Sequence, residues 1–358
     1  MIASRDVKTA LAAPPPRVSA SDSDAEPRHV RALFERAAEA QGFRRFGVAP
    51  ARPPAHGNVF ERWLQNGFHA TMDYLPASRG LRADPATLLP GARSVLVLSH
   101  AYSAADPSAP DGARTARYAL AEDYHRTLRR KCDLVVASVR AAGVEFEARI
   151  CVDSAPLNER DFAASAGIGW VGKNGMILNR EDGSYFLLCE ILLDIALPFD
   201  ALRTDHCGSC TRCLDACPTD AFVAPRVLDA SRCLSYWTIE QREVIPEEIV
   251  ERMNGWVFGC DICQEACPYN RPIEAGSFDR EAPTLRALLE TGSAEWKRRW
   301  ADTPLARAGA AGMRRNAAAA ASGAGAADLL PALAARVAGD HAVVAEQARR
   351  ASEKLSPR

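Results

Sequence analysis

Eight of the eleven cysteines in this 358-residue chain lie between Cys207 and Cys267, and their spacing is the strongest chemical signal in the sequence. The first four form a Cys-x2-Cys-x2-Cys-x3-Cys-Pro run that begins at Cys207 and ends at Pro218. The second half places Cys233 ahead of a Cys-x2-Cys-x3-Cys-Pro run that begins at Cys260. Soft thiolates bind soft iron, and the first run is the one that bacterial two-cluster proteins use to hold [4Fe–4S] clusters. The sequence therefore predicts an iron–sulfur protein.

We predict two [4Fe–4S] clusters with crossed ligation, because in the bacterial ferredoxin pattern the last cysteine of a run reaches the other cluster. The predicted sets are Cys207, Cys210, Cys213 and Cys267 for one cluster, and Cys217, Cys233, Cys260 and Cys263 for the other. Two zinc sites are the alternative, but the usual zinc pattern of two separated Cys-x2-Cys pairs does not produce this run. Cys132, Cys151 and Cys189 lie in apolar contexts and are predicted to be buried packing residues.

The composition is that of a globular protein without a dominant charge. Its 44 basic and 45 acidic residues give a net charge of −1, so any anionic partner must meet a local basic patch. No apolar run approaches the roughly 20 residues needed to span a bilayer. The only short apolar stretch near the amino terminus is followed by three prolines, which does not fit a signal peptide. We therefore expect a cytoplasmic protein with no membrane partner.

The chain is predicted to divide into four parts. These are a disordered extension at 1–26, an α/β domain at 27–200, a bacterial ferredoxin-like two-cluster domain at 201–275 and an α-helical carboxyl-terminal region at 276–358. In the α/β domain we expect strands near 43–48, 94–99, 145–152 and 185–195, and helices near 58–66, 121–142 and 156–166. The Ala-rich carboxyl-terminal region favours a capping helical bundle over a degenerate HEAT-like pair.

The α/β domain should carry the reacting group, because iron–sulfur clusters transfer electrons but do not by themselves transform an organic substrate. Its segment 152–174 is rich in polar residues and glycines, which are uncommon in a hydrophobic core. Asp153 ends a predicted strand, where an aspartate is more often a helix N-cap than a catalyst. Gly167, Gly169 and Gly172 permit close approach of the backbone to a planar ligand, or an unusual turn.

Several motifs together resemble the epoxyqueuosine reductase family, and the similarity runs from about residue 30 to residue 316. The motifs are Asp153, the glycine-rich Gly167–Asn174, Gly183-Ser184-Tyr185, the Cys-Gly-Ser-Cys run at 207–210, Cys233-Leu-Ser-Tyr236 and Phe258–Cys263. Upstream, Leu81–Pro85, Arg117-Tyr-Ala119 and Asp123-Tyr-His125 also match. The combination is far more specific than any single piece.

The resemblance implies the last step of queuosine synthesis, in which an epoxide on the wobble nucleoside of tRNA is reduced to an alkene. In that family a base-off cobalamin lies between the α/β domain and the clusters. Electrons from the clusters would generate cob(I)alamin, a nucleophile for the epoxide ring, and Asp153 matches the family's proton donor. A partly desolvated cavity would raise the pKa of Asp153 and keep it protonated. The implied partners are a tRNA anticodon loop and an electron donor for the clusters.

The resemblance also assigns residues to the corrin, each with a simpler alternative. The implied contacts are Arg82, Asp153, Ile177, Leu188, Ser235, Cys260 and Asp261. Arg82 could instead be a solvated surface charge, and Ile177 and Leu188 ordinary core residues. Ser235 and Asp261 could be helix caps.

Lys173 and Asn174, which follow the glycines, and His125 upstream are further residues with side chains that could bind a cofactor. Lys173 and Asn174 are candidates for orienting amides or phosphate of the cofactor. Asp123-x-His125 resembles the start of a motif that supplies a lower cobalt ligand in other cobalamin folds, but position 128 is Leu where that motif has Gly. We therefore reject a histidine ligand to cobalt, in agreement with the base-off state that the resemblance implies.

Local basic clusters could contact tRNA phosphates, although a solvated helix face is the simpler interpretation. One cluster comprises Arg114, Arg117, Arg126, Arg129, Arg130 and Lys131, and the other Lys297, Arg298 and Arg299. Tyr236 and Trp237 are candidates for stacking on a base, which should be splayed from the anticodon loop to enter a pocket.

Two other functions compete with this prediction. A reductive dehalogenase-like corrinoid enzyme also combines cobalamin with two clusters, but a twin-arginine export signal is missing here, and Asp153 suits epoxide opening. A simple two-cluster electron-transfer protein has no need of an α/β domain of about 170 residues.

Overall fold

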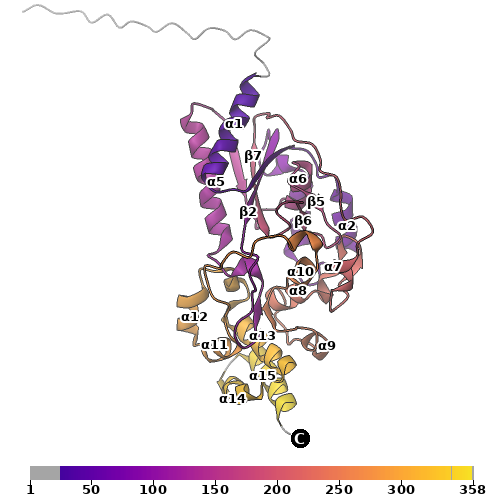
Figure 1. Ribbon diagram of the computed structural model, residues 1–358, viewed down its shortest axis with the longest axis vertical. Helices are drawn as coiled ribbons and strands as arrows, with labels where there is room; N and C mark the ends of the chain where they lie inside the picture. The colour runs from indigo at the N-terminus through magenta and orange to yellow at the C-terminus, as the bar shows by residue number, and fades with distance from the viewer. Residues whose placement is uncertain (1–24, 340, 357–358) are drawn as a thin grey trace, which may run out of the picture.

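The computed structural model describes residues 25–339 and 341–356, and Figure 1 shows the α/β domain at one end and the carboxyl-terminal helices at the other. Most of the predicted extension, 1–24, lies outside these residues. The described chain begins in helix α1 (Ala25–Ala40), so residues 25 and 26 are helical where we expected disorder. Val30 and Phe34 on α1 are buried, because the apolar residues of this helix recur at helical spacing and face the sheet.

The α/β domain is built on a four-stranded sheet with the order β1-β2-β7-β4. The strands are β1 (Arg45–Pro50), β2 (Ser94–Ala101), β4 (Ala148–Cys151) and β7 (Phe186–Leu193), close to the four predicted strands. All three strand pairings are antiparallel. The alternation of helices and strands predicted the mixed architecture, but it did not reveal these strand directions.

Helices cover both faces of this sheet. α1 and α5 (Tyr124–Ala141) pack against each other on one face, and α6 (Glu159–Ser165) packs on the other. Because side chains alternate along a strand, β2 sends Leu96 and Leu98 to the α1/α5 side and Val95 and Val97 to the α6 side. Cys132, Cys151 and Cys189 are fully buried in these two cores, as predicted.

Short elements complete this domain. They are α2 (Gly57–Gln65), α3 (Tyr74–Ala77), α4 (Arg79–Arg82), η1 (Pro85–Thr87), β3 (Arg114–Thr115), η2 (Arg117–Ala119), and the hairpin of β5 (Trp170–Val171) with β6 (Ile177–Leu178). A Cβ on Gly169 would lie 2.1 Å from the carbonyl oxygen of Leu178. The glycine at this position therefore serves close packing of the chain on itself.

The cysteine-rich segment folds into short helices and hairpins. Its elements are α7 (Arg212–Asp215), β8 (Phe222–Ala224), β9 (Val227–Leu228), η3 (Ala230–Arg232), α8 (Leu234–Ile239), α9 (Glu247–Val250), β10 (Trp256–Phe258), α10 (Ile262–Glu265) and η4 (Pro268–Asn270). β10 pairs in parallel with β3, so one strand of the α/β domain and one strand of the cysteine-rich segment form a small sheet together.

The carboxyl-terminal region is helical, as predicted, and packs on the cysteine-rich segment. Its elements are α11 (Leu285–Glu290), α12 (Ser293–Trp300), η5 (Pro304–Arg307), α13 (Gly309–Ala324), η6 (Ala327–Leu329), α14 (Leu330–Gly339) and α15 (Ala342–Leu355). Trp256 and Phe258 of β10 share one core with Met313 and 317–321 of α13. None of the described helices has the length and apolarity to span a lipid bilayer.

A buried arginine joins the α/β domain to the cysteine-rich segment. The main-chain N–H of Arg117 donates to Asp261 at 2.8 Å, and its Nη1 donates to Asp261 at 3.1 Å and to Glu265 at 2.7 Å. The Arg117 side chain is only 8 % exposed. Arg114 donates to the same Glu265 at 2.6 Å and covers the ring of Trp256. The prediction that Arg117 and Arg114 contact tRNA is therefore wrong, because internal carboxylates and an aromatic ring occupy their guanidinium groups.

We expect Arg117→Ala to lower the free energy of unfolding by about 3–5 kcal/mol, because it leaves the Asp261 carboxyl buried without its cation. Chemical denaturation of the anaerobic protein measures the change. Arg286→Ala is the matched control, since Arg286 makes only exposed ion pairs with Glu290 and Asp328 and should change stability little. Equal effects of the two substitutions would show that the Arg117 network does not hold the domains together.

Candidate cluster sites and active site

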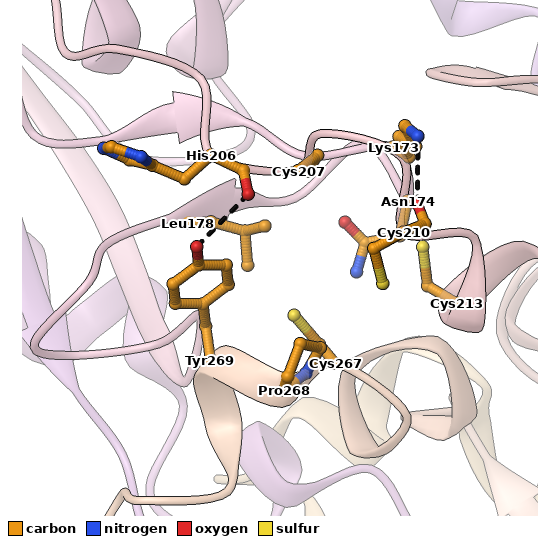
Figure 2. Close-up of a pocket in the computed structure, with 10 residues that line it drawn as sticks. All are labelled: Lys173, Asn174, Leu178, His206, Cys207, Cys210, Cys213, Cys267, Pro268 and Tyr269. Carbon is orange, nitrogen blue, oxygen red and sulfur yellow. Dashed lines mark hydrogen bonds between the residues drawn. The ribbon is translucent and has the colours of Figure 1, made fainter.

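The first predicted cysteine set surrounds a cavity of about 330 Å³ (Figure 2). The cysteines that line it are Cys207, Cys210, Cys213 and Cys267. Three of them come from the start of the first run and the fourth is the last cysteine of the second run. The fold therefore brings parts of the two runs together. Leu178 of β6, His206, Pro268 and Tyr269 complete the wall. The structure thus assembles the four thiols of one crossed set around a single space.

The β5–β6 hairpin holds the first cysteine loop in place. Lys173 Nζ donates to the carbonyl oxygens of Gly208 at 2.7 Å and Cys210 at 2.9 Å. Trp170 Nε1 donates to Cys207 Sγ at 3.5 Å, a contact that would stabilise a thiolate at that position. Asn174 donates to the carbonyl oxygen of Cys263 at 3.4 Å. The expectation that Lys173 and Asn174 orient the corrin is not supported, since both side chains bind the cysteine loops.

The second predicted set, Cys217, Cys233, Cys260 and Cys263, consists of half-buried thiols. Burial raises the pKa of Cys260, and the charges of Cys233 and Cys217 raise it further. Burial likewise raises the pKa of Cys263, with further contributions from Cys260 and Cys233. Such thiols give up their protons when a metal centre binds them. Their chemistry therefore fits a cluster, which would hold all four as thiolates.

Asp153 lies on the loop between β4 and α6 in a left-handed conformation with φ of 47°. Its Oδ2 lies 3.0 Å from His125 Nε2, and Nδ1 of the same ring lies 2.7 Å from Asp123 Oδ1. The main-chain N–H of Asp153 donates to the carboxyl group of Glu159. The side chain is 58 % exposed. Because α6 begins at Glu159 and Asp153 caps no helix, the N-cap alternative is wrong.

The pKa of Asp153 shifts in the direction opposite to our prediction. Partial desolvation favours the neutral acid, but the hydrogen bond and charge of His125, helped by Tyr124 and Arg160, hold the pKa below its ordinary value. The hydrogen bond to Asp153 in turn raises the pKa of His125, against desolvation and with support from Asp123. The predicted isolated acid is instead an acid–imidazole pair, in which the proton resides mainly on His125.

Tyr118 of η2 lies on the segment that precedes α5. Burial raises the pKa of Tyr118, and the negative charges of Asp153 and Asp261 raise it further. Asp261 directly follows Cys260. The Tyr118 ring packs edge-on against Tyr124, with 5.9 Å between centroids.

The predicted corrin contacts lie on different elements around this region. Arg82 is half-buried and donates to the carbonyl oxygen of Leu157 at 2.9 Å, so it is not the solvated surface charge of the simpler interpretation. Burial lowers the pKa of Arg82, although the negative charge of Glu159 opposes this shift. Ile177 is buried in β6, and Leu188 is a half-buried residue of β7.

Ser235 and Asp261 differ in their surroundings. Ser235 lies in the first turn of α8 behind Cys233, and its main-chain N–H faces the Cys233 thiol. Asp261 occupies the N-cap position of α10 but makes no capping hydrogen bond, because Arg117 engages its carboxylate. Asp261 is therefore the N-cap residue by position, as the simpler interpretation predicted, but its carboxylate does not cap the helix.

Neither of the two aromatic residues predicted to stack on a base, Tyr236 and Trp237, is exposed. Tyr236 is buried, and its hydroxyl group lies 2.7 Å from Thr71 Oγ1, so its ring is unavailable for a base. Trp237 is half-buried against the carboxyl-terminal core. Tyr74 is 47 % exposed instead, with the Arg307 guanidinium 5.7 Å from its ring centroid.

The remaining basic residues lie on α5 and α12. Arg126, Arg129 and Arg130 of α5 are exposed, as are Lys297, Arg298 and Arg299 of α12. The N–H of Asp123 donates to the carbonyl oxygen of Asp302 at 2.7 Å, which joins the start of α5 to the end of α12. Lys131 is half-buried instead, with its amine 6.0 Å from the Phe43 ring centroid.

Sequence reasoning missed three residues of this site. His125 was considered only as a cobalt ligand, although the short Asp123-x-His125 spacing could have suggested a hydrogen-bonded pair. Glu159 was part of the segment dense in polar residues but received no role. Tyr74 had no distinguishing signal, because its proximity to Asp153 arises only in the folded chain.

Comparison with known proteins places this geometry in a family. A family model described as a 4Fe-4S double cluster binding domain matches residues 206–270, and a second, described as epoxyqueuosine reductase QueG, DUF1730, matches residues 82–154. The chain is 37 % identical over 336 residues to epoxyqueuosine reductase from Xanthomonas campestris pv. campestris, covering 90 % of this chain and 95 % of the relative. It is 40 % identical over 282 residues to that from Pseudomonas aeruginosa, covering 75 % and 78 %.

Solved structures of epoxyqueuosine reductases have a fold similar to that of this chain. A crystal structure of selenomethionine-labelled epoxyqueuosine reductase superposes with a TM-score of 0.83 at 29 % identity, covering 92 % of this chain and 91 % of that one. Another, of epoxyqueuosine reductase with an epoxyqueuosine-modified tRNA-Tyr stem loop, has a TM-score of 0.81 at 28 % identity, with the same coverage. Epoxyqueuosine reductase from Bacillus subtilis, with its catalytic aspartate loop swung out of the active site, has a TM-score of 0.82 at 28 % identity and again the same coverage.

The double-cluster domain joined to an α/β domain with an acid–imidazole pair defines an iron–sulfur reductase. More particularly, the chain belongs to the epoxyqueuosine reductase family. This membership favours an enzyme over the simple electron carrier that we considered, and an epoxide reductase over a dehalogenase-like enzyme.

The anaerobically reconstituted protein should contain roughly eight irons per chain, and Cys207→Ser or Cys260→Ser should each lose about four, because the two residues belong to different sets. Cys132→Ser is the control and should lose none, since Cys132 is buried between α5 and β7. Iron and sulfide analysis measures the result. Loss of all iron from Cys132→Ser, or none from both ligand variants, would contradict the assignment.

The His125 ring should titrate above its ordinary pKa of about 6.5, because its proton is shared with an ionised Asp153. Asp153→Asn removes that negative charge, so the titration midpoint should fall. NMR of the imidazole as a function of pH measures both values. A midpoint that is unchanged by Asp153→Asn would show that the two side chains are not coupled.

Proposed function

We propose that this chain reduces the epoxide of epoxyqueuosine at the wobble position of tRNA to the alkene of queuosine. Asp153 would be the proton donor, two [4Fe–4S] clusters would supply electrons from an external donor, and a base-off cobalamin would act at the substrate. The observation that carries the proposal is the hydrogen-bonded His125–Asp153 pair. A substrate in the tRNA pool also favours the cytoplasm.

The residues present fit a corrin between the α/β domain and the second cysteine set. Half-buried Leu188 offers an apolar contact. Ser99 pairs with it across the sheet, and the buried Ser99 Oγ has no hydrogen-bond partner within the described chain, which a polar group of the cofactor would supply. When bound, cobalamin would provide a low-potential cobalt nucleophile for the epoxide carbon. Arg82, Ile177, Ser235, Cys260 and Asp261 are the further residues that we propose to contact it.

The chain's own residues would handle the protons. Reduction of the epoxide to an alkene consumes two electrons and two protons and releases water. When the ring opens, the oxygen that was bonded to carbon becomes basic and takes a proton from the His125–Asp153 pair. Asp153 lies on a loop, as the catalytic aspartate of the Bacillus subtilis relative does. The hydrogen bond between His125 and Asp153 would keep a proton available to the Asp153 carboxyl group, which would deliver it to the oxygen.

The tRNA would approach over the basic surface around α5 and α12. Exposed Tyr74 and Arg307 lie near Asp153 and present an aromatic face backed by a cation, which suits a splayed nucleobase. The exposed Arg126, Arg129 and Arg130 would meet phosphates of the anticodon stem. This is a local patch, as the net charge of −1 requires.

The test is conversion of epoxyqueuosine-containing tRNA by the anaerobic, cluster-loaded protein with and without cobalamin, followed by mass spectrometry of the nucleosides. We expect conversion only with cobalamin and a reductant. Asp153→Asn should lower the rate by at least about 100-fold, as expected for loss of a general acid. Its iron content and cobalamin binding should remain those of the wild type.

Asp133→Asn is the control, because Asp133 is an exposed residue of α5 and should leave the rate unchanged. Absence of conversion by the fully loaded wild type would overturn the proposed function. Wild-type turnover by Asp153→Asn would leave the function but remove Asp153 as its proton donor.

A further inference from the structure

A second ionisable group lies directly behind the candidate proton donor. Glu159, the first residue of α6, accepts the main-chain N–H of Asp153 and so fixes a residue whose left-handed φ of 47° costs energy. Without this hydrogen bond the loop would lose its link to α6. Glu159 is therefore placed to control where the Asp153 carboxyl group points.

Glu190 lies deeper, on the central strand β7. It is 0 % exposed, and neither of its carboxyl oxygens has a hydrogen-bond partner within the described chain. It pairs with Val97 on β2 and Cys151 on β4, both of which face α6, so its side chain lies on the same side of the sheet as Glu159. A bare carboxylate in such surroundings would be very unfavourable.

The two carboxyl groups influence each other. Burial raises the pKa of Glu190, and the charge of Glu159 raises it further. Burial and the charge of Asp153 raise the pKa of Glu159 to about 7, although Arg160 and Arg82 oppose the shift. The charged and titratable groups that influence this pair are Asp153 on the loop, Arg160 on α6, Arg82 on α4, Cys151 on β4 and, from the other face of the sheet, Tyr124 and Cys132 on α5. Like-charged neighbours in a dry site retain at least one proton between them.

We propose that Glu159 and Glu190 form a buried carboxyl pair that positions Asp153 and stores the second proton consumed by the reaction. This inference rests on the proposed function, whose stoichiometry requires two protons for every two electrons. The His125–Asp153 pair gives one proton as the epoxide C–O bond breaks, which leaves a hydroxyl group. When the remaining C–O bond breaks and the alkene forms, the leaving hydroxide needs the second proton to become water.

Glu159 returns that proton to Asp153. Once Asp153 and His125 have given up the first proton, Asp153 is an unshielded carboxylate beside a protonated carboxyl group, and transfer restores the acid for the second bond-breaking step. The pair is then recharged from solvent through half-buried Glu159, since Glu190 is sealed inside the sheet. Glu159 is thus a positioning residue that acts through Asp153.

Infrared difference spectroscopy of the protein between about pH 5 and about pH 9 tests the stored proton without turnover. We expect the carbonyl band of a protonated carboxyl group to persist to about pH 7 or above and to be lost or shifted in both Glu159→Gln and Glu190→Gln. Glu39→Gln is the matched control, because Glu39 is exposed on α1 and should leave the band unchanged. A wild-type spectrum without such a band would overturn the proposal.

The rate of conversion separates positioning from proton storage. Glu159→Gln keeps an oxygen that can accept the N–H of Asp153 but has no proton to give, so we expect a rate at least about tenfold lower, with a changed pH profile. Glu190→Gln should alter the same profile while iron content stays normal. A wild-type rate and pH profile in Glu159→Gln would refute storage. If the wild type converts no substrate, the proposed function fails while the infrared result still decides whether the buried pair exists.

Discussion

The buried contact of Arg117 with Asp261 and Glu265 is the constraint on which this molecule depends. It joins the element that precedes α5 to Asp261, which lies between the predicted cluster ligands Cys260 and Cys263, and to Glu265 of α10. A buried guanidinium with two carboxylates is stable only in nearly fixed geometry, because desolvation penalises any unpaired charge. The relative placement of the reacting loop and the second cysteine set is therefore specified by packing and charge rather than by a flexible linker.

A second set of contacts joins the α/β domain to the cysteine-rich segment. The N–H of Ser184 donates to Asn270 Oδ1 at 2.7 Å, and a Cβ on Gly183 would lie 2.1 Å from that oxygen. The Gly183-Ser184 motif is thus a docking point for the second cysteine run. Both sets of contacts fix the cysteine-rich segment against the α/β domain, which carries His125 and Asp153.

The sequence predicted the elements and the cysteine chemistry well, because periodicity and metal-ligand spacing are local signals. Strands near 94–99 and 185–195 appear as β2 and β7, and the helical carboxyl-terminal region is present. Predictions about single charges failed where their partners lie far away in the sequence. Arg117 was considered as an RNA contact or a solvated charge because its partner Asp261 lies 144 residues away, and the pKa of Asp153 was predicted in the wrong direction because His125 comes from another element.

The central claim is that the fold divides eight thiols into two crossed sets. A crystal structure of the anaerobic protein with anomalous scattering measured at the iron edge tests it most directly. We predict two four-iron centres, one in the cavity bordered by Cys207 and Cys267 and the other bound by Cys233 and Cys260. Single metal ions, or one cluster bound by an uncrossed cysteine run, would contradict the account.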